Sequence, residues 1–193
     1  MAAAAAADEI LELQLRAFKW KRLADVHELY LANEQLTEAP DVSRFSLLKY
    51  LWLNNNKIKK VTFSPANYIL CELYLHNNKL TDITGSLKNV KSLRILTLHN
   101  NWLTDVLKTV KEFRNLKFLH TLNLFHNPLA LEPDYRLYLI YYVPSLQNLD
   151  QRGIDQQERE ASVALCNPDR VRVITISGWL RSNFLRTKSF PQK

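Results

Sequence analysis

The chain has 193 residues, of which 47% are hydrophobic, enough for one domain with a sizeable core. It carries 26 Lys and Arg against 19 Asp and Glu, and the resulting net charge of +7 favours an acidic partner. Three glycines exclude the glycine-rich loops that hold nucleotide phosphates, and two cysteines exclude a disulfide framework or a cysteine-based zinc site.

Residues 1–7 are Met1 followed by six alanines, for which we expect an unstructured tip or a sequence artefact, with a short helix start as the alternative. They lack the basic region and the bulky apolar region of a secretory signal. The sequence contains no stretch of 18 apolar residues, so we expect no membrane-spanning helix. Residues 8–25 follow as a predicted helical cap, with the helix itself over 8–22. Its expected buried stripe has helical spacing: Ile10, Leu13, Ala17 and Trp20.

Residues 26–145 contain five copies of the pattern L-x-x-L-x-L-x-x-N-x-L, with conservative replacements. The copies begin at Val26, Leu48, Leu70, Leu93 and Leu119, and a partial sixth begins at Leu146. Side chains two residues apart in a strand point the same way, so each L-x-L step predicts a short strand with its leucines buried. Apolar residues between the copies recur at about every third position and predict 3₁₀ or helical turns, with an α-helix within 104–117.

One polar position of the pattern is an asparagine in four copies: Asn56, Asn78, Asn101 and Asn127. The first copy has Glu34 there and Asn33 one place earlier, which puts the same packing in doubt at that end. The pattern is identified as a leucine-rich repeat array. This resemblance implies an α/β solenoid with parallel strands on the concave face, short helices or 3₁₀ turns on the convex face, and helical caps. It also implies that the asparagine amides bond the backbone of the turns.

Residues 127–160 resemble the C-terminal cap of the short intracellular leucine-rich repeat class. That class includes the phosphatase-one regulatory subunit, the spliceosomal A-prime protein and several axonemal proteins, and segments 24–31 and 47–58 are most similar to its ciliary-type members. Gln151 stands where the class has glycine, so the turn after Asp150 is expected to differ. Asp155 to Glu158 predicts a capping box that starts a helix over 156–165, within a cap at 146–167. The residues that match the class are Asn127, Pro128, Leu129, Tyr135, Arg136, Leu139, Ile140, Pro144, Leu146, Leu149, Asp150, Glu158 and Arg159.

Large aromatic residues occupy the outward positions of the predicted strands. Because parallel strands lie about 4.8 Å apart, Tyr30, Trp52 and Tyr74 should stack as a ladder with Tyr50 beside it. Exposed aromatics are typical anchors of protein interfaces. A ladder that only stabilises strand pairing, or one covered by the chain's own tail, remains an alternative. The predicted protein-binding residues of the concave face are Tyr30, Tyr50, Trp52, Tyr74, His76, His99 and Phe125.

Histidines 76 and 99 fall in one column of the predicted sheet, and His126 lies one place further along. No further ligands are clearly placed to converge on them, so we expect no metal site. The sequence also lacks a nucleophile, base and oxyanion group that converge in one cleft, so we expect no catalysis and no cofactor. Glu28 and Glu72 flank the aromatic ladder, which makes a nucleic acid less favoured there than a protein.

Residues 168–193 form a basic and aromatic tail that holds six basic residues against one acid, or +5 of the net charge. We interpret it as a docking arm that becomes ordered on a large assembly. A disordered tail, or a strand over 170–177 that folds back onto the repeats, remains an alternative. The predicted docking residues are Arg170, Arg172, Trp179, Arg181, Phe184, Arg186 and Lys188.

Together these features predict a non-enzymatic protein-binding scaffold or adaptor. The class resemblance implies a structural component of a cytoskeletal assembly such as the ciliary axoneme, with tubulin or axonemal proteins as partners and no membrane association. It places the protein inside the cell, in the cytoplasm, the cytoskeleton or the axoneme. A regulatory subunit of a protein phosphatase and a ribonucleoprotein component are the alternatives.

Overall fold

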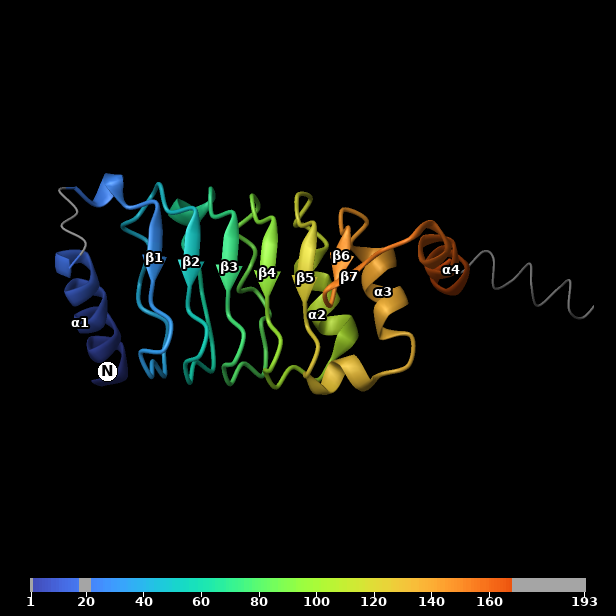
Figure 1. Cartoon of the computed structure of the whole chain (residues 1–193), viewed down its shortest axis with the longest axis horizontal. Helices are drawn as coiled ribbons and strands as arrows, with labels where there is room; N and C mark the ends of the chain where they lie inside the picture. The colour runs from blue at the N-terminus through green and yellow to red at the C-terminus, as the bar shows by residue number, and fades with distance from the viewer. Residues whose placement is uncertain (1, 18–21, 168–193) are drawn as a thin grey trace, which may run out of the picture.

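The computed structural model describes residues 2–17 and 22–167, which stack as a solenoid along one axis (Figure 1). One sheet of seven strands follows the chain order: β1 (Glu28–Tyr30), β2 (Tyr50–Trp52), β3 (Glu72–Tyr74), β4 (Ile95–Thr97), β5 (Thr121–Asn123), β6 (Asn148–Leu149) and β7 (Arg152–Gly153). The first six strands are parallel, and β7 runs antiparallel to β6. The predicted leucine-rich repeat solenoid is therefore confirmed.

The repeat pattern sets the register of every strand. The central leucine of each of the first five strands is buried and pairs with its counterpart in the next strand, as Leu51 does with Leu29 and Leu73. The second leucine of each L-x-L step is also buried, because the two side chains share one face of the strand. The leucines of successive repeats thus form one continuous core behind the sheet.

The side opposite the sheet is closed by turns and short helices. These are η2 (Pro65–Asn67), α2 (Val106–Phe113), η3 (Pro128–Leu131) and α3 (Tyr135–Tyr142). A further turn, η1 (Leu23–Asp25), comes just before β1 and buries no residue. The helix predicted within 104–117 is α2, and the Asp105 side chain accepts a hydrogen bond from the Lys108 N–H at its start. The apolar residues predicted to close this side are all buried: Ile83, Leu87, Val90, Val106, Val110, Phe113 and Leu116.

Two consecutive positions build each turn after a strand. The first takes a left-handed backbone with φ between 54° and 66°: Asn33, Asn55, Asn77, Asn100 and His126. Asparagine tolerates this conformation better than most residues, so the chain needs few glycines here. The second is the asparagine of the repeat pattern (Asn56, Asn78, Asn101 or Asn127), which we call the ladder asparagine. Its amide bonds the backbone of its own repeat and of the preceding one.

The first repeat follows the same rule without a ladder asparagine. Asn33, with φ of 66°, holds the left-handed position, so it is not a displaced ladder residue. Asn56 supplies the bonds to this turn, because it accepts from the Leu36 N–H and donates to the Leu31 carbonyl. Glu34 has no earlier repeat to bond, and it accepts instead from Gln14 of the N-terminal helix at 3.2 Å.

The N-terminal helix differs from its prediction. Helix α1 (Ala2–Ala17) contains the alanine run that we expected to be unstructured, and it covers the end of the sheet beside β1 (Figure 1). Its buried face is Ala7, Leu11 and Leu15 with Ile10 partly buried, while Leu13 is exposed, so the predicted stripe was wrong. Two stripes fit a helical period here, and the observed one uses an alanine that the prediction had left out of the helix. Trp20 lies outside the described residues.

The C-terminal cap is a network of the residues that match the class. Arg136 forms a two-pronged ion pair with Glu158 at 2.7 and 3.0 Å, and it also donates to the Leu149 and Gly153 carbonyls. Helix α4 (Gln156–Cys166) begins at the predicted capping box. The turn between β6 and β7 is left-handed at both Asp150 and Gln151, so a glycine is not required for it to form.

Candidate protein-binding surface

The outward side chains of the strands form two adjacent columns. Strand pairing aligns Tyr30 with Trp52 and Trp52 with Tyr74, as the sequence predicted. The ring centroids lie 6.0 and 5.4 Å apart, and the Trp52 and Tyr74 planes differ by only 3°. Tyr50 stacks on the other side of Trp52 at 6.2 Å. Trp52 is thus the ring that the other three contact.

The same run of rings continues into the next column. His76 meets Tyr74 edge-on at 6.5 Å and stacks on His99 at 4.4 Å. His99 in turn stacks on Phe125 at 4.4 Å, and His126 packs edge-on against Phe125 at 5.0 Å. An unbroken series of eight aromatic and imidazole rings therefore crosses five strands.

This ring series contains all seven residues predicted for the concave face: Tyr30, Tyr50, Trp52, Tyr74, His76, His99 and Phe125. The sequence did not assign His126 to the surface. It lies one residue after the column, at a left-handed backbone position, and its ring packs on Phe125. The series is exposed at its two ends, Tyr30 with 51% of its surface and His126, and half-buried between them.

Hydrogen bonds and burial favour the uncharged forms of Tyr74, His76 and His99. The Tyr74 hydroxyl donates to Glu72 at 2.6 Å, and burial together with this bond raises the pKa of Tyr74 to about 12. Burial lowers the pKa of His99 to about 4, helped by the nearby His76 and His126, and burial also lowers the pKa of His76. Both imidazoles are therefore neutral near pH 7.

Two buried polar atoms on this surface have no hydrogen-bond partner among the described residues, His99 Nδ1 and Asn54 Oδ1. Most buried polar atoms in proteins are paired, so these two are exceptions within the surface. The outward positions of β1 to β5 carry Glu28 and Glu72 but no lysine or arginine. The surface offers rings, amides and carboxylates, which suits a polypeptide better than a phosphate backbone.

Other chemistry predicted or excluded from the sequence can be placed as well. No group of three metal-binding side chains occurs within residues 2–17 and 22–167. Both cysteines are free thiols, and Cys71 lies half-buried just before β3. None of the helices in the described part of the chain is long and apolar enough to span a membrane. The docking residues predicted in the tail lie outside the described residues: Arg170, Arg172, Trp179, Arg181, Phe184, Arg186 and Lys188.

Comparisons with known proteins agree with this architecture. A family described as leucine-rich repeat matches residues 48–175, which is more than half of the chain. The curated relative "Probable U2 small nuclear ribonucleoprotein A'" of Drosophila melanogaster is 32% identical over 158 residues, covering 78% of this chain and 51% of the relative. A chain in the crystal structure of the Drosophila melanogaster SNF/U2A′ complex superimposes with a TM-score of 0.67 at 26% identity, covering 77% of this chain and 86% of that one. The present chain thus spans about half the length of the curated relative.

Proposed function

Because this chain belongs to the leucine-rich repeat family, we propose that it is a non-enzymatic scaffold that binds a protein segment across the ring series of its sheet. Repeat arrays of this kind bind partners on the extended surface that their stacked repeats create. The ring series is where large, rigid side chains gather on that surface.

The observation that carries this proposal is the continuity of the ring series. Tyrosine and tryptophan lose little conformational entropy on binding and dominate the energetics of protein interfaces. Here the rings are held in place by stacking before any partner arrives, with Trp52 in contact with three of them. A preorganised surface binds more tightly because less side-chain freedom is lost on association.

A ribonucleoprotein is the assembly that the comparisons favour. The curated relative is named as a component of the U2 small nuclear ribonucleoprotein, and the similar crystal structure is of a U2A′ protein in complex with SNF. We propose that the present chain joins such a particle by binding a protein of the SNF kind. Because it spans about half of the curated relative, the activity of that whole protein carries over only as part of this proposal.

The axonemal and phosphatase roles rest on the sequence resemblance alone. Neither relative described above carries a ciliary or phosphatase name. A location in the axoneme and partners such as tubulin therefore stay predictions, as does docking through the tail. Co-purification of the full chain from ciliated and non-ciliated cells would separate the axonemal role from the ribonucleoprotein role by the identity of the recovered proteins.

The binding proposal is tested by titrating the full chain with purified Drosophila melanogaster SNF in a calorimeter. We expect Trp52→Ala to weaken binding at least about tenfold, as truncation of a central anchor does. Trp102→Ala is the matched control, because Trp102 is a tryptophan with 63% of its surface exposed outside the ring series. Equal loss in both variants, or unchanged affinity in Trp52→Ala, would contradict binding through the ring series.

Strand pairing is the alternative role of the rings, and the same variants address it. If the ladder only supports the sheet, Trp52→Ala should lower the urea midpoint and leave the affinity of the folded protein unchanged. Failure of the wild-type chain to bind SNF at all would count against a ribonucleoprotein partner of that kind.

A further inference from the structure

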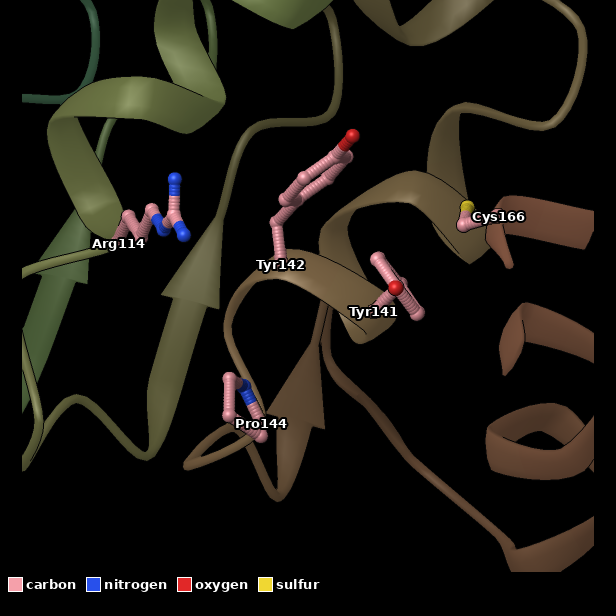
Figure 2. A pocket seen from close by; sticks show the side chains of 5 residues that line it. All are labelled: Arg114, Tyr141, Tyr142, Pro144 and Cys166. Carbon is pink, nitrogen blue, oxygen red and sulfur yellow. The ribbon is translucent and has the colours of Figure 1, made fainter. Parts of the chain in front are cut away.

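A second surface lies away from the ring series, where α2, α3 and the loops that precede β4 and β5 come together. One cavity of about 490 Å³ there is lined by Lys88, Lys91, Asn115, Lys117 and Phe118. A second cavity of about 620 Å³ is lined by Arg114, Tyr141, Tyr142, Pro144 and Cys166 (Figure 2). Consecutive residues at the end of α2 line the two cavities, Asn115 the first and Arg114 the second, so both cavities lie at that end of the helix. We call the residues that line them the basic–aromatic surface.

The cations of this surface are unpaired. Lys88, Lys91, Arg114 and Lys117 are all exposed, and none makes an ion pair or a side-chain hydrogen bond within the described residues. Arg94, in the loop between them, is exposed and unpaired in the same way. By contrast Lys108, on the neighbouring α2, bonds Asp82 at 2.8 Å.

No acidic residue occurs in segments 88–94 and 114–118. Asp134, which lies near Cys166, is a carboxylate at the border of the surface. A cluster of like charges repels itself, so it favours an anionic ligand that spans several of the charges at once.

Aromatic rings accompany these cations. Phe118 lies among lysines and keeps 63% of its surface exposed. Tyr141 and Tyr142 are half-buried at the end of α3, with their rings edge-to-face at 5.1 Å. Figure 2 shows Arg114 reaching the cavity from the end of α2 and the two tyrosines reaching it from α3. The surface therefore alternates positive charges with open ring faces.

That combination is what single-stranded nucleic acid requires. Lysines and arginines neutralise the phosphates, while exposed rings stack on bases that are not held in a duplex. An acidic polypeptide would use the charges but has no flat groups for Phe118 and the tyrosine pair. A duplex hides its base faces and would use the charges alone.

We propose that the basic–aromatic surface binds single-stranded nucleic acid, with phosphates against Lys88, Lys91, Arg114 and Lys117 and with bases stacked on Phe118 and Tyr142. This activity goes beyond the proposed function, since it uses residues outside the ring series and does not depend on the protein partner. Whether the strand is RNA or DNA is the difference that the test resolves.

The test measures fluorescence anisotropy of labelled oligonucleotides of about 12 nucleotides, within the usual site size, titrated with the full chain at several salt concentrations. The probes are one mixed sequence as single-stranded RNA, as single-stranded DNA and as a DNA duplex. We expect the single strands to bind more tightly than the duplex, and the tighter of the two single strands identifies the natural class.

The variants separate this surface from the general positive charge of the chain. The double variant Lys91→Ala/Lys117→Ala should weaken single-strand binding about tenfold and reduce the slope of log affinity against log salt by about 1.4, as expected for two lost phosphate contacts. The matched control is Lys59→Ala/Lys60→Ala, which removes the same charge from another exposed pair. Phe118→Ala should weaken binding at least about fivefold through lost stacking, and Trp102→Ala should not.

Three outcomes would overturn the proposal. Equal losses in the two lysine double variants would show that net charge alone attracts the probe. Unchanged affinity in Phe118→Ala, or a duplex that binds as tightly as the single strands, would remove the role of stacking. Displacement of the RNA by a polyglutamate peptide at equal charge concentration would assign the surface to an acidic protein.

Discussion

Substitution of Asn78 by alanine should strongly destabilise the solenoid. The Asn78 carbonyl oxygen accepts from the Ile58 N–H at 2.9 Å, and its amide donates to the Leu53 and Leu75 carbonyls at 2.9 and 3.0 Å. The side chain is buried, with 5% of its surface exposed. Water therefore cannot replace these bonds without opening the stack.

The loss of its Asn78 hydrogen bond does not cost each of the three backbone groups the same free energy. Within the described residues the Ile58 N–H has no other hydrogen-bond partner, and leaving it unsatisfied would cost about 1–3 kcal/mol. The Leu53 and Leu75 carbonyls keep a second donor, Asn56 and Asn101 respectively, so each loses about 0.5–1.5 kcal/mol. Together these losses should lower the free energy of unfolding by about 2–6 kcal/mol.

Urea denaturation followed by circular dichroism measures this change, with Lys79→Ala as the control. Lys79 is an exposed neighbour whose side chain makes no hydrogen bond among the described residues, and its loss should change stability by less than about 0.5 kcal/mol. Asn127→Ala should cost more than Asn78→Ala, because the Leu124 carbonyl then loses its sole side-chain donor within the described residues. If Asn78→Ala changes the free energy of unfolding no more than Lys79→Ala does, the asparagine ladder is not a source of stability.

Three further predictions concern the caps and the imidazole stack. Gln151→Gly should raise the free energy of unfolding by about 0.5–1 kcal/mol in urea denaturation, because the left-handed φ of 63° strains a residue that has a side chain. As a control, Gln157→Gly within helix α4 should lower the free energy of unfolding by about 1 kcal/mol. Arg136→Ala should cost about 2–4 kcal/mol in the same assay, since it removes both bonds to Glu158 and the bonds to the Leu149 and Gly153 carbonyls, and Arg136→Lys should recover only part of this. The His99 pKa of about 4 lies below the ordinary value of 6.5, so the unfolded chain binds more protons between those values and stability should fall as the pH drops through that window. After allowance for partial exposure, the loss of unfolding free energy is about 1–2 kcal/mol, measured by urea denaturation at several pH values. His99→Phe keeps the stack and should abolish the part of the pH dependence that comes from His99.

The repeat period made most of the fold predictable. Once the L-x-L steps were aligned, the strands and their outward columns followed, because side chains alternate in a strand and identical repeats stack in register. The stack of Trp52 on Tyr74 and that of His76 on His99 both needed only this geometry. Their place in one continuous series also needed the contact between Tyr74 and His76, which joins the two columns.

Features without a period were harder to predict. In α1, two apolar stripes fitted the helical spacing, and only packing against the first repeat selects Leu11 and Leu15 over Leu13. Strand β7 depends on a turn with two left-handed residues at Asp150 and Gln151, neither of which is glycine. Such local strain is stabilised by the surrounding cap, and no short sequence pattern records it.

The basic–aromatic surface was not predictable for a related reason. Its residues come from three separate segments of the chain, none of which has an unusual composition by itself. The first segment holds Lys88 and Lys91, the second Lys117 and Phe118, and the third Tyr142. Residues 168–193 hold +5 of the net charge of +7, which leaves only +2 for residues 1–167. Stacking brings these dispersed cations together, so a nearly neutral repeat domain still presents a concentrated positive surface.

The ring series and the basic–aromatic surface have different chemistry. This difference determines how a complex of the chain with SNF and a nucleic acid strand would assemble. Binding at the ring series relies on stacking and burial, which change little with salt, whereas binding at the basic–aromatic surface releases counterions and weakens steeply as salt rises. Trp52 and Lys117 also share no contact among the described residues, so their substitutions should act additively. Trp52→Ala should therefore leave oligonucleotide affinity unchanged, and Lys91→Ala/Lys117→Ala should leave SNF affinity unchanged. A loss of both activities in either variant would mean that one surface serves both ligands, and the assignment of separate sites would then be wrong.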